Sequence, residues 1–197
     1  MSRAVNDDAL DILFRKARTH RNWRAEPVTP QILMAAYDLM RWAPTVNNTS
    51  PGRIVFVISR KAKERLKPHL NKGNVEQTMS APATAILGYD LQFFEKMSKL
   101  SPNLNARDSW LQKSPAELEQ AAFRSGTLQG AYFILAARAV GLDCGPMSGF
   151  ENDGVDREFF AETSIKSNFL CNLGYGDETG LRPRAGRLEF DEACRIL

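Results

Sequence analysis

Residues 114–141 read SPAELEQAAFRSGTLQGAYFILAARAVG, and this stretch contains the start, the body and the end of one long helix. Ser114 and Glu117 stand at capping-box spacing with a proline between them, and Gly141 suits the C-terminal stop. No charged residue occurs between residues 125 and 137, so this part is apolar on nearly every side. A single domain has limited room to surround such a helix. We therefore expect a second subunit to cover part of it.

Short apolar runs on either side of this helix predict a buried sheet. Residues 54–58 and 83–87 are rich in β-branched and aliphatic side chains, which suits strands covered on both faces, and residues 168–173 are expected to form a last strand. Residues 144–150 contain too many Gly and Pro for a regular element, so we expect a loop there. Alternation of helices with buried strands points to an α+β (layered α/β) protein. Further helices are expected after Asn6, from Thr29, after Ser59, near 75–79, around 155–160 and near 190–196.

Length and composition bound the class of protein. The chain has 197 residues, of which 43% are hydrophobic and 25% charged, so we expect one globular domain spanning 1–197. A net charge of +3 is too small to favour nucleic acid as a partner. The sequence shows no signal-peptide pattern and no apolar run of membrane-spanning length, and its three cysteines form no disulfide pattern. We expect a cytoplasmic protein that is not bound to a membrane.

The familiar catalytic signatures do not occur in the sequence. It has no Gly-Lys-Ser/Thr phosphate loop, no Gly-x-Ser-x-Gly and no His-Glu-x-x-His, and its two histidines lack neighbouring metal ligands. Cys144 and Cys171 stand in or beside apolar runs, which indicates inert core thiols. Two basic clusters remain, at residues 18–21 (RTHR) and at Arg184 with Arg187. Planar guanidinium groups suit phosphate, although surface arginines are commonly only solvated.

Five segments of the chain, taken in order, resemble the FMN-dependent nitroreductases. Residues 18–23 (RTHRNW) are similar to the Arg-Ser-x-Arg-x-Phe opening of that family, and residues 43–51 (APTVNNTSP) to its Ala-Pro-Ser-x-x-Asn-x-Gln-Pro loop. Asn74, residues 141–150 (GLDCGPMSGF) and residues 173–176 (LGYG) continue the match up to the arginine tail. Any one motif is weak, but five in register are specific. Within the family, the chain is most similar to the subgroup that includes malonic semialdehyde reductase of pyrimidine breakdown, on residues 17–20, 50–56, 145–150 and 166–168.

The resemblance implies a nitroreductase-like fold, with a mixed, mainly antiparallel sheet flanked by helices and the long helix at a homodimer interface. It implies that Arg18, Thr19, Arg184 and Arg187 hold the phosphate of FMN. Arg21 would lie near the N1 and O2 edge of the flavin, where reduction builds negative charge. Further implied cofactor contacts are His20, Asn48, Asn74 and Gln77, the segment Pro146, Met147, Ser148 and Gly149 on one flavin face, and Pro44, Thr45 and Val46 from the other subunit.

We therefore expect an FMN-dependent oxidoreductase that takes hydride from NADH or NADPH onto flavin N5 and reduces a small acceptor by ping-pong turnover. The acceptor stays open between an aldehyde such as malonic semialdehyde, a nitro compound and a quinone. No catalytic side chain and no metal ligand is assigned, because the flavin carries the chemistry. One alternative is a flavin-binding sensor or storage protein without turnover. Another is a weak nucleic-acid binder that uses its arginines.

Overall fold

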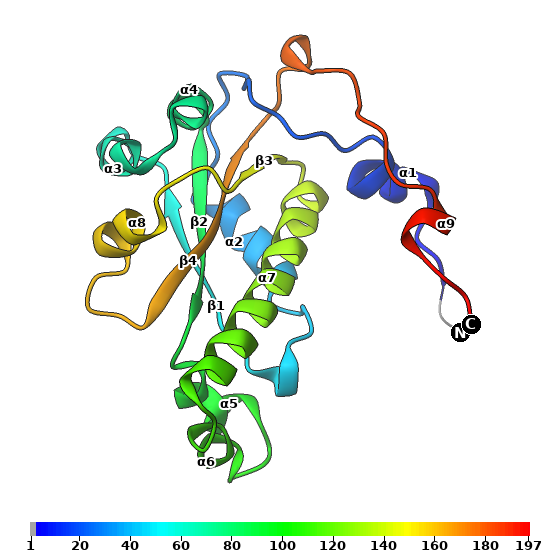
Figure 1. The fold of residues 1–197 in the computed structure, drawn as a ribbon. Coiled ribbons are helices and arrows are strands. Elements are labelled where there is room, and N and C mark those ends of the chain that lie inside the picture. The colour runs from blue at the N-terminus through cyan, green and yellow to red at the C-terminus, as the bar shows by residue number, and fades with distance from the viewer. Residues whose placement is uncertain (1–2) are drawn as a thin grey trace.

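The computed structural model describes residues 3–197 and places a four-stranded sheet between two layers of helices (Figure 1). The strands lie in the order β1-β2-β4-β3, and each neighbouring pair is antiparallel. One isolated parallel bridge joins Thr19 to Cys144 at the sheet edge. The expected α+β class and mainly antiparallel sheet are confirmed. The strands are β1 (Gly52–Val57), β2 (Ala83–Asp90), β3 (Asp143–Met147) and β4 (Ile165–Gly174).

The central strands β2 and β4 build a separate core on each face of the sheet. All eight residues of β2 are buried, as the apolar run predicts. Because strand side chains alternate between the faces, Ala85 and Cys171 pack with α2 (Pro30–Met40) and α7 (Pro115–Ala139). Ile86 and Leu170 point to the opposite face, where α3 (Arg60–Leu66) and α8 (Asn152–Phe159) contribute the covering side chains.

The edge strand β1 differs from the expectation that residues 54–58 are covered on both faces. It begins at Gly52 and ends at Val57, and its first five residues are only half-buried. Helix α7 packs against β1, whereas α8 of the other layer contacts β4. The expectation of burial on both faces is therefore wrong for the single chain. The helices of the second layer pack over the centre of the sheet and leave the edge strand β1 partly exposed.

The expectation of a loop at residues 144–150 is also wrong, because residues 144–147 belong to strand β3. Cys144 pairs with Leu173 and Pro146 with Cys171 across the β3–β4 ladder. An edge strand tolerates proline, since one side of its backbone needs no partner. Gly145 is needed there, because a Cβ would lie 2.5 Å from the backbone carbonyl oxygen of residue 20.

Helix α7 begins and ends as predicted. The capping box and the proline at its start are present, and Gly141 follows its end with a φ of 87°. Two glycines let the helix lie close to the sheet. A Cβ at Gly126 would lie 2.8 Å from the Tyr89 Cβ, and one at Gly130 would lie 2.6 Å from the Phe169 ring. The Gly-x-x-x-Gly spacing therefore serves packing of this helix on the sheet.

The other helices follow the predicted positions, with additions at both ends of the fold. The first helix is a short α1 (Asp7–Leu10), capped by Asn6, and continues as a π-helical turn over Asp11–Arg15. Two helices without a sequence prediction, α5 and α6, form one tip of the molecule (Figure 1). No helix of the described residues is long and apolar enough to cross a membrane. The remaining helices are α4 (Lys72–Ser80), α5 (Met97–Leu100), α6 (Ala106–Leu111) and α9 (Phe190–Ala193).

Cys144 and Cys171 are buried core thiols, as expected. A hydrogen bond with the Cys144 thiol, together with burial, raises the pKa of Cys171 well above its ordinary value. A thiol with a raised pKa carries little thiolate at neutral pH and is a poor nucleophile.

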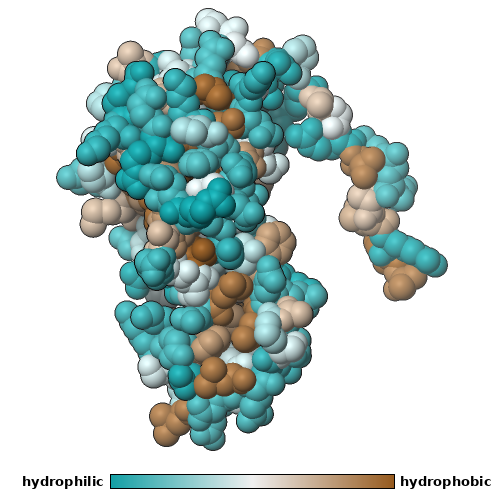
Figure 2. Space-filling view, turned by 60° about the vertical axis from the view of Figure 1, so that its left-hand side comes forward, coloured by the Kyte–Doolittle hydropathy of each residue, from teal (hydrophilic) through white to brown (hydrophobic). Residues whose placement is uncertain are grey.

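Residues 181–197, called the C-terminal arm below, run away from the sheet beside the N-terminal helix (Figure 1). In Figure 2 this arm projects from the body of the molecule and carries several hydrophobic groups. Leu188, Phe190 and Ile196 are all exposed. Exposed apolar side chains gathered on one segment are typical of an interaction surface.

Candidate functional site

The segment 18–24 is held along one edge of the sheet. Thr19 forms a bridge with Cys144 of β3, and the backbone N–H of His20 donates to the Cys144 carbonyl at 3.0 Å. Further along, Trp23 bridges Gly176 just beyond β4. Backbone pairing therefore fixes Arg18 and Arg21 of this segment relative to β3 and β4.

The C-terminal arm returns to the same place. The Arg18 guanidinium donates to the carbonyl of Arg182, and the Arg184 guanidinium donates to the carbonyl of Ala17 at 2.9 Å. Residues more than 160 positions apart in sequence thus contact each other directly. The structure brings together the two basic clusters that the sequence singled out.

These segments enclose a cavity of about 620 Å³, called the basic cavity below. None of its lining residues is acidic. Within the described chain, Arg15 forms ion pairs with Asp7 and Asp11, but the other cavity arginines have no carboxylate within 4.0 Å. Concentrated positive charge without acidic partners favours an anionic ligand. The arginines lining the basic cavity are Arg15, Arg18, Arg21, Arg138, Arg182, Arg184 and Arg187.

His20 does not line the basic cavity but lines a neighbouring one, together with Arg18 and Asp143. Its side chain is 6% exposed, and Nε2 lies 3.4 Å from the Asp143 carboxylate. The Nδ1 atom is buried without a hydrogen-bond partner among the described residues. Gly176 lies directly over the imidazole, since a Cβ there would be 2.0 Å from Nδ1. The ring therefore packs between the segment 18–24 and the end of β4.

Asn74 and Gln77 lie on helix α4 and form one hydrogen-bonded group with Gly149. The Asn74 side chain donates to the Gly149 carbonyl at 2.8 Å and accepts from the Gln77 side chain at 2.5 Å. The Gln77 carbonyl accepts from the Trp23 indole at 3.2 Å. Trp23 thus connects this group with the segment that carries Arg18 and Arg21.

The segment Pro146, Met147, Ser148 and Gly149 consists of the last two residues of β3 and the two that follow, and Gly149 contacts α4. Met147 is half-buried and its sulfur accepts a weak hydrogen bond from the Thr78 hydroxyl at 3.6 Å. Ser148 is exposed. A Cβ at position 149 would collide with the side-chain amide nitrogen of Asn74, so a larger residue there would displace the Asn74 side chain. This close approach lets the backbone of the segment pack directly on α4.

The loop that contains Pro44, Thr45, Val46 and Asn48 lies elsewhere in the chain. The Val46 N–H donates to the Ser125 hydroxyl at 3.3 Å, and the Asn48 side chain donates to a carbonyl of α5 at 2.9 Å. Ser125 and the cavity-lining Arg138 stand 13 positions apart on α7, which separates them by about 20 Å. A single chain therefore does not bring this loop to the basic cavity.

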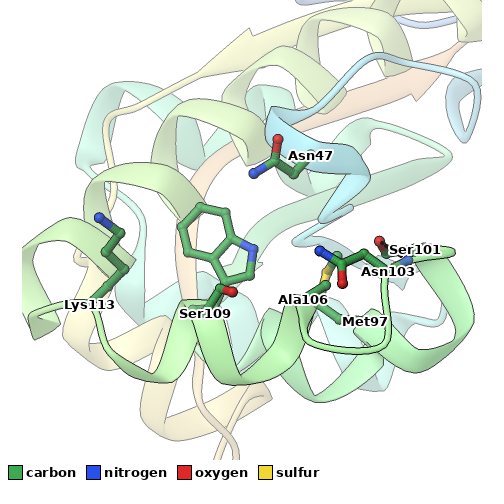
Figure 3. Close-up of a pocket in the computed structure, with 8 residues that line it drawn as sticks. Asn47, Met97, Ser101, Asn103, Ala106, Ser109 and Lys113 are labelled. Atoms are coloured by element: carbon green, nitrogen blue, oxygen red, sulfur yellow. Dashed lines mark hydrogen bonds between the residues drawn. The ribbon is translucent and has the colours of Figure 1, made fainter.

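This loop is also strained and borders a second cavity, of about 430 Å³ (Figure 3). Asn47, Asn48 and Ser50 have φ values of 47°, 56° and 43°, in the left-handed region. In Figure 3, Asn47 faces this cavity from one side and Lys113 from the other, near α6. Strain of this kind persists only where surrounding contacts hold it.

Three arginines of the basic cavity, Arg15, Arg138 and Arg182, were missed by the sequence reasoning. Arg182 belongs to the same arginine-rich tail as Arg184 and Arg187, so its spacing offered a signal. Arg138 offered a weaker one, as a basic residue in the last turn of the long helix. It donates to the Leu13 carbonyl at 2.9 Å and so holds the N-terminal helix beside α7.

Three comparisons with known proteins agree with one another. A family model described as "Nitroreductase family" matches residues 14–175. A protein of Polynucleobacter asymbioticus, provisionally named as an NADH dehydrogenase/NAD(P)H nitroreductase, is 54% identical over 197 residues, covering 100% of both chains. A provisionally named nitroreductase from Bacillus subtilis has 22% identity and a TM-score of 0.85, covering 98% of this chain and 100% of that one. Another from Exiguobacterium sibiricum, solved in complex with FMN, has 19% identity and a TM-score of 0.84, covering 100% of both chains.

Proposed function

The chain belongs to the nitroreductase family, and from this premise we propose that it is a single-domain, FMN-dependent oxidoreductase that uses NADH or NADPH. The observation that carries the proposal is the basic cavity, where arginines from both ends of the chain converge with no acidic lining residue. A phosphate monoester is a compact anion that planar guanidinium groups bind well. The FMN held by the protein from Exiguobacterium sibiricum supports the same cofactor here.

The cavity residues fit the phosphate end of FMN. Arg18, Thr19, Arg184 and Arg187 all line the basic cavity and would hold the phosphate. Arg21 lines it too and would stabilise the negative charge that reduction adds along N1 and O2 of the flavin. Separate residues for the phosphate and for the ring would let the protein bind and tune the cofactor independently.

The flavin ring would extend toward the group formed by Asn74, Gln77 and Gly149. Support comes from Trp23, which joins this group to the arginine segment through the Gln77 carbonyl. The half-buried amides of Asn74 and Gln77 offer hydrogen bonds suited to ring oxygen and nitrogen atoms. We propose that His20 does not contact the flavin but stabilises the position of the segment 18–24, because its imidazole is buried beside Asp143.

FMN, when bound, supplies the chemistry of accepting hydride from NAD(P)H and delivering electrons to an acceptor in ping-pong turnover. The residues of this chain bind and orient the cofactor and set its electrostatic surroundings. Of the possible acceptors we favour a small aldehyde of the malonic semialdehyde type, on the subgroup motifs at residues 145–150 and 166–168. Nitro compounds and quinones are the competing acceptors. The three free cysteines of the described chain support a reducing, cytoplasmic location.

We further propose that the active form is a homodimer. The chain exposes 12502 Å², whereas a compact 22.1 kDa monomer exposes about 9,300 Å². The excess is about 3,000 Å² for each chain, or about 6,000 Å² for two, which is at the upper end of what obligate homodimers bury in total. Part of it is apolar: Trp42 beside α2 is 77% exposed, and Leu128 on α7 is 46% exposed. Figure 2 shows hydrophobic groups gathered on the lower half of the visible face as well as along the arm.

In such a dimer the loop with Pro44, Thr45, Val46 and Asn48 would reach the cofactor of the partner subunit. Support comes from its position about 20 Å from the basic cavity of its own chain and from the backbone strain at Asn47 and Asn48, which neighbouring side chains hold in place. Two equivalent sites would then form across one symmetric interface.

Flavin analysis of the purified protein tests this function. We expect a yellow protein that releases FMN on denaturation and oxidises NADH or NADPH when malonic semialdehyde, a nitroarene or menadione is supplied. Bound FMN without steady turnover would favour the sensor or storage alternative. Release of FAD, or no bound flavin after soaking with FMN, would overturn the proposal.

A further inference from the structure

The C-terminal end of helix α4 leaves backbone carbonyls that its own helix does not satisfy. Pro82 follows two residues after the helix, and proline has no N–H to donate. The residue before proline is also driven out of the helical conformation, and Ala81 is extended at φ −62° and ψ 140°. The carbonyl groups of the last turn therefore need other donors.

Side chains from separate segments provide these donors. The Gln77 carbonyl accepts from the Trp23 indole at 3.2 Å and from the Asn172 side-chain amide at 3.2 Å. The Thr78 carbonyl accepts from the Lys63 ammonium group at 2.6 Å. The end of α4 is thus tied to α3, to strand β4 and to the segment that carries Arg18 and Arg21.

Asn172 lies at the centre of this arrangement and is fully buried. Its side-chain oxygen accepts from the Thr84 hydroxyl of β2 at 2.7 Å, and its side-chain nitrogen also reaches the Thr78 hydroxyl at 3.3 Å. The Thr78 hydroxyl in turn donates to the Met147 sulfur at 3.6 Å. One amide therefore connects β2, β4, α4 and, through Thr78, β3. The side-chain oxygen and the side-chain nitrogen of Asn172 therefore both have hydrogen-bond partners, as buried polar atoms require.

A neighbouring ring depends on the same packing. The Trp23 indole lies against Gly145 and Gly174, where added Cβ atoms would come within 3.3 and 2.8 Å of the ring. Its N–H shares the Gln77 carbonyl with Asn172. Loss of the Asn172 donor would remove the side-chain tie between α4 and Asn172 of β4, so the Gln77 carbonyl would be held to the segment 18–24 by the indole hydrogen bond alone.

We propose that Asn172 is a positioning residue, which fixes α4 so that Asn74 and Gln77 on that helix stand in register with the arginine segment. The part of this inference that concerns flavin rests on the proposed function. The part that concerns α4 can be tested without any cofactor. Asn172 acts through Gln77 and Thr78, and no direct contact with the flavin is assigned to it.

Hydrogen exchange of the apoprotein, followed by mass spectrometry, tests the first part. In Asn172→Leu, amides of α4 should exchange at least tenfold faster than in the wild type, measured relative to α8 as an internal reference. Gln129→Leu is the matched control, because Gln129 is also a buried amide but accepts from Gly52 N–H at 2.7 Å, on β1. It should leave the ratio of α4 to α8 unchanged. The smaller Asn172→Ser variant gives the same measurement if the leucine variant does not fold. An unchanged ratio in the Asn172 variant overturns the proposal.

Riboflavin binding tests the second part. Riboflavin lacks the phosphate, so its affinity reports the contacts of the ring and the ribityl chain without those of the phosphate. In Asn172→Leu or Asn172→Ser the affinity for riboflavin should fall at least tenfold, while the ratio of FMN to riboflavin affinity stays at the wild-type value. Faster exchange of α4 with unchanged riboflavin affinity would refute the role of Asn172 in the flavin site and leave the proposed function standing. A wild-type protein that binds neither flavin would refute the proposed function. The hydrogen-exchange experiment would still test whether Asn172 holds α4 in place.

Discussion

Replacement of Arg187 by alanine should weaken FMN binding and leave the fold of the apoprotein intact. The Arg187 guanidinium lines the basic cavity, and its hydrogen bonds within the described chain go to the neighbouring carbonyls of Ala185 and Gly186, at 3.0 and 2.9 Å. Exposed contacts of this local kind change the free energy of unfolding by only a few tenths of a kcal/mol. Removal of one of several like charges also lowers their mutual repulsion.

The expected loss of affinity follows from the charge of the hydrogen bond removed. A bond between a charged donor and its acceptor contributes about 1.5–3 kcal/mol, which corresponds to roughly a 10-fold to 150-fold rise in the dissociation constant of FMN. Arg18→Ala should cost as much or more, because the Arg18 guanidinium also holds the carbonyl of Arg182 on the C-terminal arm. Riboflavin, which has no phosphate, should bind the wild type and Arg187→Ala equally.

Titration of the apoproteins with FMN and riboflavin, followed by flavin fluorescence, measures these changes, and thermal unfolding of the apoproteins reports their stability. Arg157→Ala is the control, because Arg157 is exposed on α8 and is absent from the lining of the basic cavity. Equal FMN affinity in the wild type, Arg18→Ala and Arg187→Ala would refute the assignment of the phosphate site. A loss of riboflavin affinity that matches the loss of FMN affinity would refute it too.

Three further predictions address the charge, the assembly and the buried lysine. Arg21→Met should lower the midpoint potential of bound FMN, by about 30 mV for each roughly 1.4 kcal/mol of lost stabilisation of the reduced form; a potentiometric titration with an unchanged midpoint would remove Arg21 from the flavin edge. Leu128→Glu should give monomers that lose FMN, because this half-exposed residue on α7 lies on the proposed interface; light scattering that reports flavin-loaded dimers would contradict it. Burial, with a smaller effect from Arg60, lowers the pKa of Lys63 from 10.5 to about 8. The unfolded chain then binds more protons than the folded one between these values, so stability to urea should rise with pH across that interval. Lys63→Met should lose this rise, and an identical pH dependence in the variant would refute it.

Local physics explains which parts of the fold could be predicted from the sequence. The ends of α7 are set by neighbouring residues, the capping box and Gly141, so short-range reasoning finds them. Strand β3 could not be found in this way, because glycine and proline normally break a strand. Its pairing depends on Leu173 and Cys171, more than 20 positions away, and on its place at the sheet edge. The formation of β3 therefore depends on tertiary pairing with β4, which the composition of the strand itself does not reveal.

The residues of the candidate site also differ in whether local sequence patterns reveal them. Arginine clusters at residues 18–21 and 184–187 are visible as charge, but only the resemblance indicated that they meet, since no local pattern joins segments this far apart. Asn172 has no visible signal at all, because it stands within the apolar run of β4 and its partners Gln77 and Thr84 come from other elements. A buried amide in a strand can be recognised as an anchor only when the structure shows which backbone carbonyl it satisfies.

The proposed function predicts that cofactor binding and assembly are linked through the basic cavity. Arg182, Arg184 and Arg187 belong to the C-terminal arm, and in the apoprotein their charges repel those of Arg18 and Arg21. A bound phosphate removes this repulsion, and any ligand that binds only the folded form stabilises it, by about 2.7 kcal/mol at a concentration 100 times its dissociation constant. In the proposed dimer, the exposed apolar residues of the arm beyond Arg187 would pack on the partner subunit. FMN binding and dimer formation should therefore strengthen each other, because both require the arm in one position.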